Sequence, residues 1–305
     1  MNNKTMIKLR KDFTKNWSLY LIVLPVIAYY ICFCYKPMYG ALIAFFNYKP
    51  NRGVWASDWV GLKYFIAFFK NPNFLKYIRN TLNISVTSLC INFPLPIILA
   101  LLLNEVKNAT FKRITQTFTY VPHFISLIII CGMIKTFTYH DGLINDIVVL
   151  FGGERVSMLQ EGEYFVPLYV LSGTWSGIGW SSIIYLSALS GVDQQLYEAA
   201  TIDGAGKWKQ TLHVTLPGIL PVIVIQLILA IGGLMSVGYE KIINLYNESI
   251  YDVAEVISTY VYRQGLQGKQ WGSSTAIGLF NSVINCGMVV AANKISKKVA
   301  GSALW

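Results

Sequence analysis

The segment Leu196–Pro221 reads LYEAATIDGAGKWKQTLHVTLPGILP and lies between two long apolar stretches. It combines charged residues with small Ala and Gly residues, and a Leu-Pro pair stands where the next apolar stretch begins. The charged residues are Glu198, Asp203, Lys207 and Lys209. A polar segment between two membrane-length apolar stretches is typical of a loop that projects from the bilayer. The flanking stretches therefore determine the fold class.

The composition is that of a membrane protein. Of 305 residues, 54% are hydrophobic and only 13% are charged, whereas a soluble domain has about 25% charged residues. Six stretches approach the roughly 20 apolar residues that a bilayer-spanning helix needs, and none contains Asp, Glu, Lys or Arg. They are 17–35, 81–103, 114–134, 165–189, 219–238 and 272–293. Because runs this long favour helices over barrel strands, the sequence predicts an all-α membrane protein with six transmembrane helices.

These helices form one membrane domain between two tails. The first stretch is longer than the apolar region of a signal peptide and no A-x-A site follows it, so we interpret it as an uncleaved helix. Thirteen of the 25 Lys and Arg residues fall in short segments on one side, which places both termini in the cytoplasm. The predicted segments are an N-terminal tail at 1–16, a first helix at 17–35, an outer segment at 36–80, a core of five helices at 81–293 with a cytoplasmic loop at 190–218, and a C-terminal tail at 294–305.

The sequence also lacks the motifs of several functional classes. It contains no G-x-x-x-x-G-K-[ST], H-E-x-x-H or G-x-S-x-G pattern, so we expect no catalytic residues and no ATP site of this type in this chain. The three His residues are scattered and the five Cys residues lie in apolar stretches, so we expect no metal site or other cofactor. The net charge of +10 is explained by basic residues that face anionic headgroups, not by a nucleic-acid partner.

Local sequence predicts two short helices in the opening segment. Tyr197–Ile202 suits a helix with small residues on one side, and Gly204 and Gly206 then break it. The stretch 208–214 suits a second short helix. Pro217 fits the first turn of the fifth spanning helix, where a missing N–H costs nothing.

The same segment resembles the EAA signature of permease subunits of binding-protein-dependent ABC importers. That signature is E-A-A, three residues, Gly, nine residues, Ile or Val, one residue and Leu-Pro; here it is Glu198-Ala199-Ala200, Gly204, Val214 and Leu216-Pro217. Asp203-Gly204-Ala205 also matches the usual D-G-A, whereas Thr211 replaces a Phe that is common in the sugar-importer branch. Nearly the whole chain is similar to the branch for oligosaccharides and polysaccharide fragments, for example KPMYGALIAFFNYKP (36–50), GWSSIIYLSALSGVDQQLYEAA (179–200) and YDVAEVISTYVYRQGL (251–266).

The resemblance implies a type I ABC importer permease fold in the bacterial cytoplasmic membrane. It implies that the loop is a coupling helix, which docks in a groove of a cytoplasmic ATPase subunit and transmits closure of the ATPase dimer to the spanning helices. The implied partners are a second homologous permease subunit, the ATPase dimer, which binds ATP and Mg²⁺, and an extracytoplasmic sugar-binding protein. The implied coupling residues are Glu198, Ala199, Ala200, Asp203, Gly204, Ala205, Leu216 and Pro217.

Polar residues within the predicted helices are candidates for a substrate path. Sugars are held by aromatic faces and by neutral hydrogen-bonding groups, and polar side chains in a bilayer face the bundle interior or a water-filled path. The candidates are Ser172, Trp175, Ser182 and Tyr185 on the fourth helix, Gln226 on the fifth, and Asn281 and Asn285 on the sixth. The alternative for each residue is a hydrogen bond between helices.

The sequence thus predicts a permease subunit that translocates an oligosaccharide or polysaccharide fragment and is not itself an enzyme. A permease for peptides or amino acids stays open as an alternative. An ion-coupled secondary transporter is a second alternative, which is disfavoured because no acidic residue lies deep in a predicted helix.

Overall fold

The computed structural model describes residues 12–305, so most of the predicted N-terminal tail lies outside the described residues. Within them, five segments are long and apolar enough to cross a membrane. These are Trp17–Phe45, Phe74–Glu105, Leu127–Leu150, Lys207–Gly232 and Trp271–Val299. The protein is therefore a mostly helical membrane protein.

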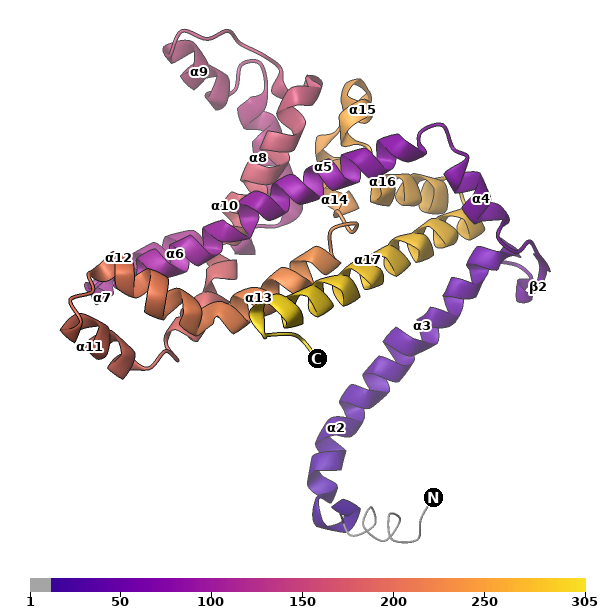
Figure 1. Cartoon of the computed structure of the whole chain (residues 1–305). Helices are drawn as coiled ribbons and strands as arrows, with labels where there is room; N and C mark the ends of the chain where they lie inside the picture. The colour runs from indigo at the N-terminus through magenta and orange to yellow at the C-terminus, as the bar shows by residue number, and fades with distance from the viewer. Residues whose placement is uncertain (1–11) are drawn as a thin grey trace.

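The first apolar segment forms an arm that, up to Met38, stands apart from the other helices, whereas residues 39–45 pack against the last long helix (Figure 1). It runs without a break through α2 (Trp17–Tyr29), the π-helical η1 (Tyr30–Tyr35), α3 (Lys36–Met38) and η2 (Tyr39–Phe45). It is longer than predicted because residues 36–45 are again largely apolar. No residue from α2 to α3 is buried. The arm therefore offers its apolar surface to lipid or to another chain.

The prediction of an all-α fold is wrong in one place, directly after the arm. Strands β1 (Phe46–Lys49) and β2 (Gly53–Trp59) pair as an antiparallel hairpin, with Phe46 opposite Trp59. The two rings meet edge to face at 4.9 Å, and such cross-strand aromatic pairs stabilise a hairpin. Gly53 reverses the chain at a φ of 74°, a conformation that glycine adopts without strain.

The second apolar segment is one long bent rod. After α4 (Lys63–Phe69), α5 (Phe74–Asn92) continues through Phe93 into α6 (Pro94–Glu105). Pro94 stands where α6 begins, which is a position that tolerates its missing N–H. Residues 74–80, ahead of the predicted helix 81–103, are therefore part of the same helix.

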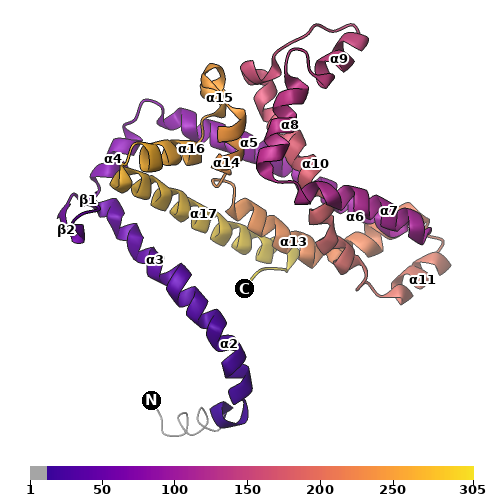
Figure 2. The same cartoon turned by 180° about the vertical axis from the view of Figure 1, so that it is seen from behind.

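The predicted continuous helix over 114–134 is wrong. The structure has α7 (Ala109–Tyr120), the short η3 (Val121–Phe124) and a separate α8 (Leu127–Thr138). Pro122 removes a backbone donor, and Ile125 and Ser126 are extended, with ψ of 131° and 146°. The Ser126 hydroxyl accepts from the Ile129 N–H at 3.4 Å and caps α8. Figure 2 shows α7 beside α6, whereas α8 extends toward α9.

The central helix of the bundle is α10 (Gly162–Leu189), which follows α9 (Leu143–Leu150) and η4 (Met158–Gln160). It is 28 residues long but rich in Ser, Gly and Trp, and it is not among the five most apolar segments. A Cβ at Gly179 would overlap the Thr119 carbonyl of α7. Glycine thus allows α7 to approach α10 closely.

The last part of the chain forms short helices and one long helix. They are α14 (Tyr239–Leu245), η6 (Glu248–Ile250), α15 (Tyr251–Ala254), α16 (Ile257–Tyr262), η7 (Arg263–Gln267) and α17 (Trp271–Ala300). The backbone is extended at Glu255 and Val256, which separates α15 from α16. Glu255 is buried there and forms an ion pair with Arg263.

Apolar clusters join these helices into one bundle. One cluster unites α5, α8, α10 and α14 around Ile84, Phe165 and Ile242. Another unites α6, α10 and α13 (Leu216–Gly232) around Ala100, Tyr185 and Ile219. In a protein surrounded by water, burying a side chain of this size contributes about 1.5–3 kcal/mol. Within a bilayer, where the lipid is also apolar, van der Waals packing between the helices contributes more to stability than burial does.

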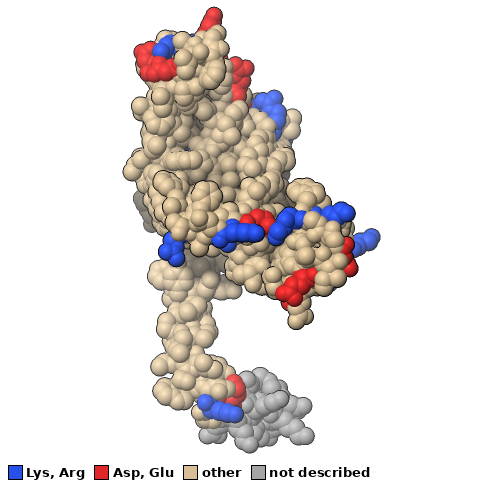
Figure 3. Space-filling view, turned by 90° about the vertical axis from the view of Figure 1, so that its left-hand side faces the viewer, with Lys and Arg blue, Asp and Glu red and all other residues tan. Residues whose placement is uncertain are grey.

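On the face shown in Figure 3, charged residues gather at the top, in a band across the lower lobe and near the tip of the arm, with largely uncharged surfaces between these places. Acidic residues gather at the end that carries α9, where Arg155 pairs with Asp146 at 2.5 Å. A row of Lys and Arg crosses the opposite lobe. This distribution suits a bilayer around the uncharged zone.

Candidate functional site

The loop around the E-A-A residues begins with α11 (Gln194–Ile202), close to the predicted helix 197–202. The Asp193 carboxylate accepts from the Gln195 N–H at 2.9 Å and caps this helix. The second short helix is not separate. Instead, α12 (Lys207–Gln210), the π-helical η5 (Thr211–Thr215) and α13 (Leu216–Gly232) form one rod from Lys207 to Gly232.

Pro217 therefore lies inside a continuous helix and not in its first turn, which corrects the prediction. The wider π-type turn of η5 comes directly before the proline. Such turns and local adjustments accommodate the donor that proline lacks. Leu216 is half-buried and Pro217 is exposed at this junction.

The turn after α11 is a Schellman motif. The Ala205 N–H donates to the Ala200 carbonyl at 2.9 Å, and the Gly204 N–H donates to the Thr201 carbonyl at 3.0 Å. Gly204 has a φ of 77°, a region that β-branched residues rarely adopt. Gly204 thus determines the direction in which the chain leaves α11.

Side chains from the following rod hold α11 in place. The Tyr197 hydroxyl donates to Thr215 Oγ1 at 3.0 Å. The buried Gln210 amide donates to Thr201 Oγ1 and to the Ala205 carbonyl, both at 3.0 Å. Motion of α11 is therefore coupled mechanically to the start of α13.

The outer face of this loop is exposed and partly apolar. Glu198, Ala199, Asp203 and Gly204 are exposed, whereas Ala200 and Ala205 are half-buried. Ile202 and Trp208 are 87% and 74% exposed and flank the turn; the sequence analysis did not select them, although both are large apolar residues in a polar loop. Adjacent exposed apolar residues with a charge beside them mark a contact surface for another protein.

The predicted path residues of α10 do not share one open surface. Ser172 donates to the Leu168 carbonyl at 2.5 Å, and the buried Ser182 donates to the Gly179 carbonyl at 2.6 Å. Tyr185 lies in the cluster with Ile219, and the Trp175 side chain is exposed on the outside of the chain.

Asn281 and Asn285 of α17 form hydrogen bonds to the non-helical segment that follows α13, which is close to the alternative of bonds between helices that the sequence left open. The Asn281 amide donates to the Met235 carbonyl at 3.0 Å. Asn285 accepts from the Met235 N–H at 3.1 Å and donates to Ser236 Oγ at 2.7 Å. They fix the non-helical segment that follows α13.

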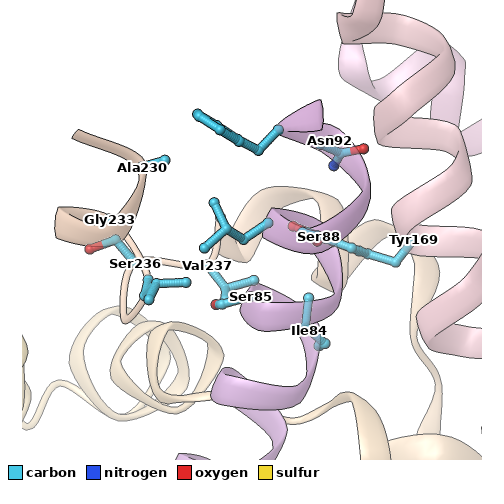
Figure 4. Close-up of a pocket in the computed structure, with 13 residues that line it drawn as sticks. Ile84, Ser85, Ser88, Asn92, Tyr169, Ala230, Gly233, Ser236 and Val237 are labelled. Atoms are coloured by element: carbon cyan, nitrogen blue, oxygen red, sulfur yellow. The ribbon is translucent and has the colours of Figure 1, made fainter. Parts of the chain in front are cut away.

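Two adjoining cavities lie between α5, α10 and α13. One has a volume of about 320 Å³ (Figure 4); its polar lining is Ser85, Ser88, Asn92, Tyr169 and Ser236. The other, of about 340 Å³, brings the predicted Tyr185 and Gln226 together with Trp180 and Ser181. Both cavities share Asn92. The sequence did contain a signal for the α5 residues, because Ser85, Ser88 and Asn92 recur at helical spacing.

A buried lysine lies beside the first cavity. Lys241 of α14, outside the five apolar segments, donates from Nζ to the Tyr169 carbonyl at 2.7 Å. The same nitrogen lies 4.4 Å from the centre of the Tyr169 ring, a cation–π contact. Burial lowers the pKa of Lys241 to about 8, so the ammonium form prevails at neutral pH. Sequence alone contains no signal for this residue, because it follows the fifth predicted helix in a polar segment where a lysine is ordinary.

Residues 92–299 match the family described as binding-protein-dependent transport system inner membrane component. The chain is 46% identical to the polygalacturonan/rhamnogalacturonan transport system permease protein YteP of Bacillus subtilis, over 94% of this chain and 90% of the relative. It is 43% identical to protein LplB of the same organism, over 96% and 91%. A chain in the crystal structure of a bacterial alginate ABC transporter, in complex with an alginate pentasaccharide-bound periplasmic protein, superimposes with a TM-score of 0.88 at 38% identity, over 97% of this chain and 100% of that one. The exposed E-A-A loop, the apolar helices and these similarities agree, and the chain belongs to the family of inner membrane permease components of binding-protein-dependent ABC transporters.

Proposed function

We propose that this inner-membrane permease passes an oligosaccharide or polysaccharide fragment, with acidic chains as the first candidates. The observation that carries the proposal is the exposed, Schellman-terminated loop, joined to a helix that lines polar cavities. The relative YteP is named for polygalacturonan and rhamnogalacturonan transport, and the solved structure concerns alginate. A permease subunit is not itself an enzyme, so the work comes from ATP hydrolysis on a partner.

We infer four partners. A cytoplasmic ATPase dimer, which binds ATP and Mg²⁺, docks on Glu198, Ala199, Ala200 and the turn at 203–205. Leu216 and Pro217, at the start of α13, support this contact surface from the side of the membrane helix. A second homologous permease covers the arm of α2 and α3, since none of their residues is buried within the described part of this chain. An extracytoplasmic binding protein delivers the sugar, and the bilayer surrounds the remaining apolar surface.

The proposed substrate path uses the two adjoining cavities. Tyr185, Gln226 and Asn92 line them, and neutral polar groups of this kind suit sugar hydroxyls. We assign Ser172, Ser182, Asn281 and Asn285 to positioning the surrounding helices, and Trp175 to the surface that meets the second permease.

The test is uptake by the complex reconstituted in proteoliposomes. Purified with its ATPase, partner permease and binding protein, the complex should take up labelled oligosaccharides only with ATP inside. Labelled peptides and amino acids should not compete. Uptake that continues without ATP and stops with an ionophore would contradict the proposal in favour of ion-coupled transport.

We also propose six spans, with α10 as the additional one and both termini in the cytoplasm. In a cysteine-depleted variant, Thr201→Cys should react with an impermeant thiol reagent only from the cytoplasmic side. Gly153→Cys, at the α9 end, should react only from outside. Both positions are exposed, so their accessibility within the chain does not limit labelling. Labelling of position 201 from outside would overturn the topology.

A further inference from the structure

The ammonium group of Lys241 has no acidic partner within residues 12–305. The side chain is only 9% exposed, and its Nζ contacts the Tyr169 carbonyl and ring. A buried ammonium is costly unless it is paired and hydrogen-bonded. Ionisable groups at such positions in membrane proteins commonly serve substrate pathways.

A second donor points to the same place. Asn92 accepts from the Thr174 hydroxyl through its Oδ1, which leaves its Nδ2 free to donate elsewhere. A Cβ at Gly173 would lie 3.4 Å from Lys241 Nζ and 3.7 Å from Asn92 Nδ2. The two nitrogens therefore both lie close to the position that a side chain of residue 173 would occupy, and glycine leaves that position empty.

This space adjoins the cavity of about 320 Å³, which Asn92 and Tyr169 line. Figure 4 shows both side chains on the side of the cavity that faces α10. One carboxylate can accept from an ammonium and an amide N–H at once, and charge-assisted hydrogen bonds of this kind are the strong ones.

We propose that Lys241 and Asn92, with Gly173 as the floor, form an anion subsite that binds the carboxylate of a uronic-acid unit as an acidic sugar chain passes. The inference rests on the proposed function and deepens it, because it assigns selection for acidic chains to this permease and not to the binding protein alone. A neutral chain leaves the ammonium without a counter-ion in the same cavity.

The test compares acidic and neutral forms of one chain. Uptake of oligogalacturonate and of alginate oligosaccharide is measured against their methyl esters, at saturating concentrations with the same binding protein. Lys241→Met removes the charge, and Gly173→Ala fills the space at ordinary contact distances. Each should reduce uptake of the acidic form by about tenfold, the loss typical of one charge-assisted hydrogen bond, and should leave ester uptake unchanged.

Two matched controls test for general damage. Gly177→Ala lies one turn further along α10, where a Cβ meets no atom within 4 Å. Lys135→Met removes the same charge from an exposed position. Both should keep wild-type uptake of the acidic form.

The outcomes separate the two proposals. Equal loss of acidic and ester uptake in Lys241→Met and Gly173→Ala would assign Lys241 a purely structural role and overturn the subsite. If the wild-type complex takes up only neutral sugars, the anion subsite is also overturned, although the proposal that the complex imports sugars remains. A complex that imports no sugar at all refutes the proposed function itself.

Discussion

Gly204→Val should reduce uptake by about 5- to 150-fold, while the ATPase subunits remain bound and still hydrolyse ATP. Gly204 has a φ of 77° and ends α11 in a Schellman motif. Holding a residue in a disfavoured backbone region costs about 1–3 kcal/mol, and a β-branched residue is strongly disfavoured there. The turn should therefore deform and point α11 away from its groove, so that ATP hydrolysis no longer drives the helices.

The backbone, not side-chain crowding, causes this effect, because a Cβ at Gly204 meets no atom within 4 Å. Gly204→Asn should thus retain most uptake, since Asn tolerates the left-handed region. Gly206→Ala is the matched control at a φ of −69°. The measurements are ATPase retention, basal hydrolysis and uptake by purified complexes in proteoliposomes. Wild-type uptake by Gly204→Val would show that the loop is only a connector.

Glu198→Ala should weaken binding of the ATPase by about 30-fold or more. Glu198 is exposed in this chain beside the apolar Ile202 and Trp208, so we expect docking to bury it against a basic group. Truncating one partner of a buried charge pair costs about 2–5 kcal/mol, much of it from the stranded opposite charge. Membrane insertion should not change, because the loop lies outside the bilayer.

The measurement is the salt concentration at which the ATPase dissociates from the detergent-solubilised complex, followed by sugar-stimulated hydrolysis. Glu198→Gln removes the charge and keeps the shape of the side chain, so it should weaken ATPase binding to a similar extent if the charge makes the contact. Glu154→Ala, an exposed acidic residue at the α9 end, removes the same charge and should behave as wild type. Unchanged dissociation of Glu198→Ala would exclude Glu198 from the contact.

The predicted features that depend on local chemistry agree with the structure. The helix at 194–202 needs only its Asp193 cap, its helix-forming residues and a glycine at its end. Apolar stretches of membrane length form helices because hydrocarbon offers the backbone no other partner. The E-A-A spacing also identified the family from local sequence, because the turn and the helices that flank it lie within about twenty residues of the chain.

Features that depend on distant partners were not predictable. Pro122 is a local signal for a kink, but the complete break at Ile125–Ser126 also depends on α7 and α8 packing against different parts of the bundle. The aromatic hairpin at 46–59 depends on cross-strand contacts, and aromatic residues near a membrane equally suit an interface.

Sequence by itself determined the membrane class, the loop with its helix-breaking glycines, and the family, because these follow from hydropathy and from spacing along the chain. Only the tertiary structure decided which polar residues share a cavity. Helical spacing places Ser172, Trp175, Ser182 and Tyr185 near one face, but the close approach of α7 at Gly179 and the apolar cluster around Tyr185 cover part of it. Lys241 and Asn92 are 149 positions apart in the sequence, and they converge only because α14 folds back against α10, which no local pattern encodes.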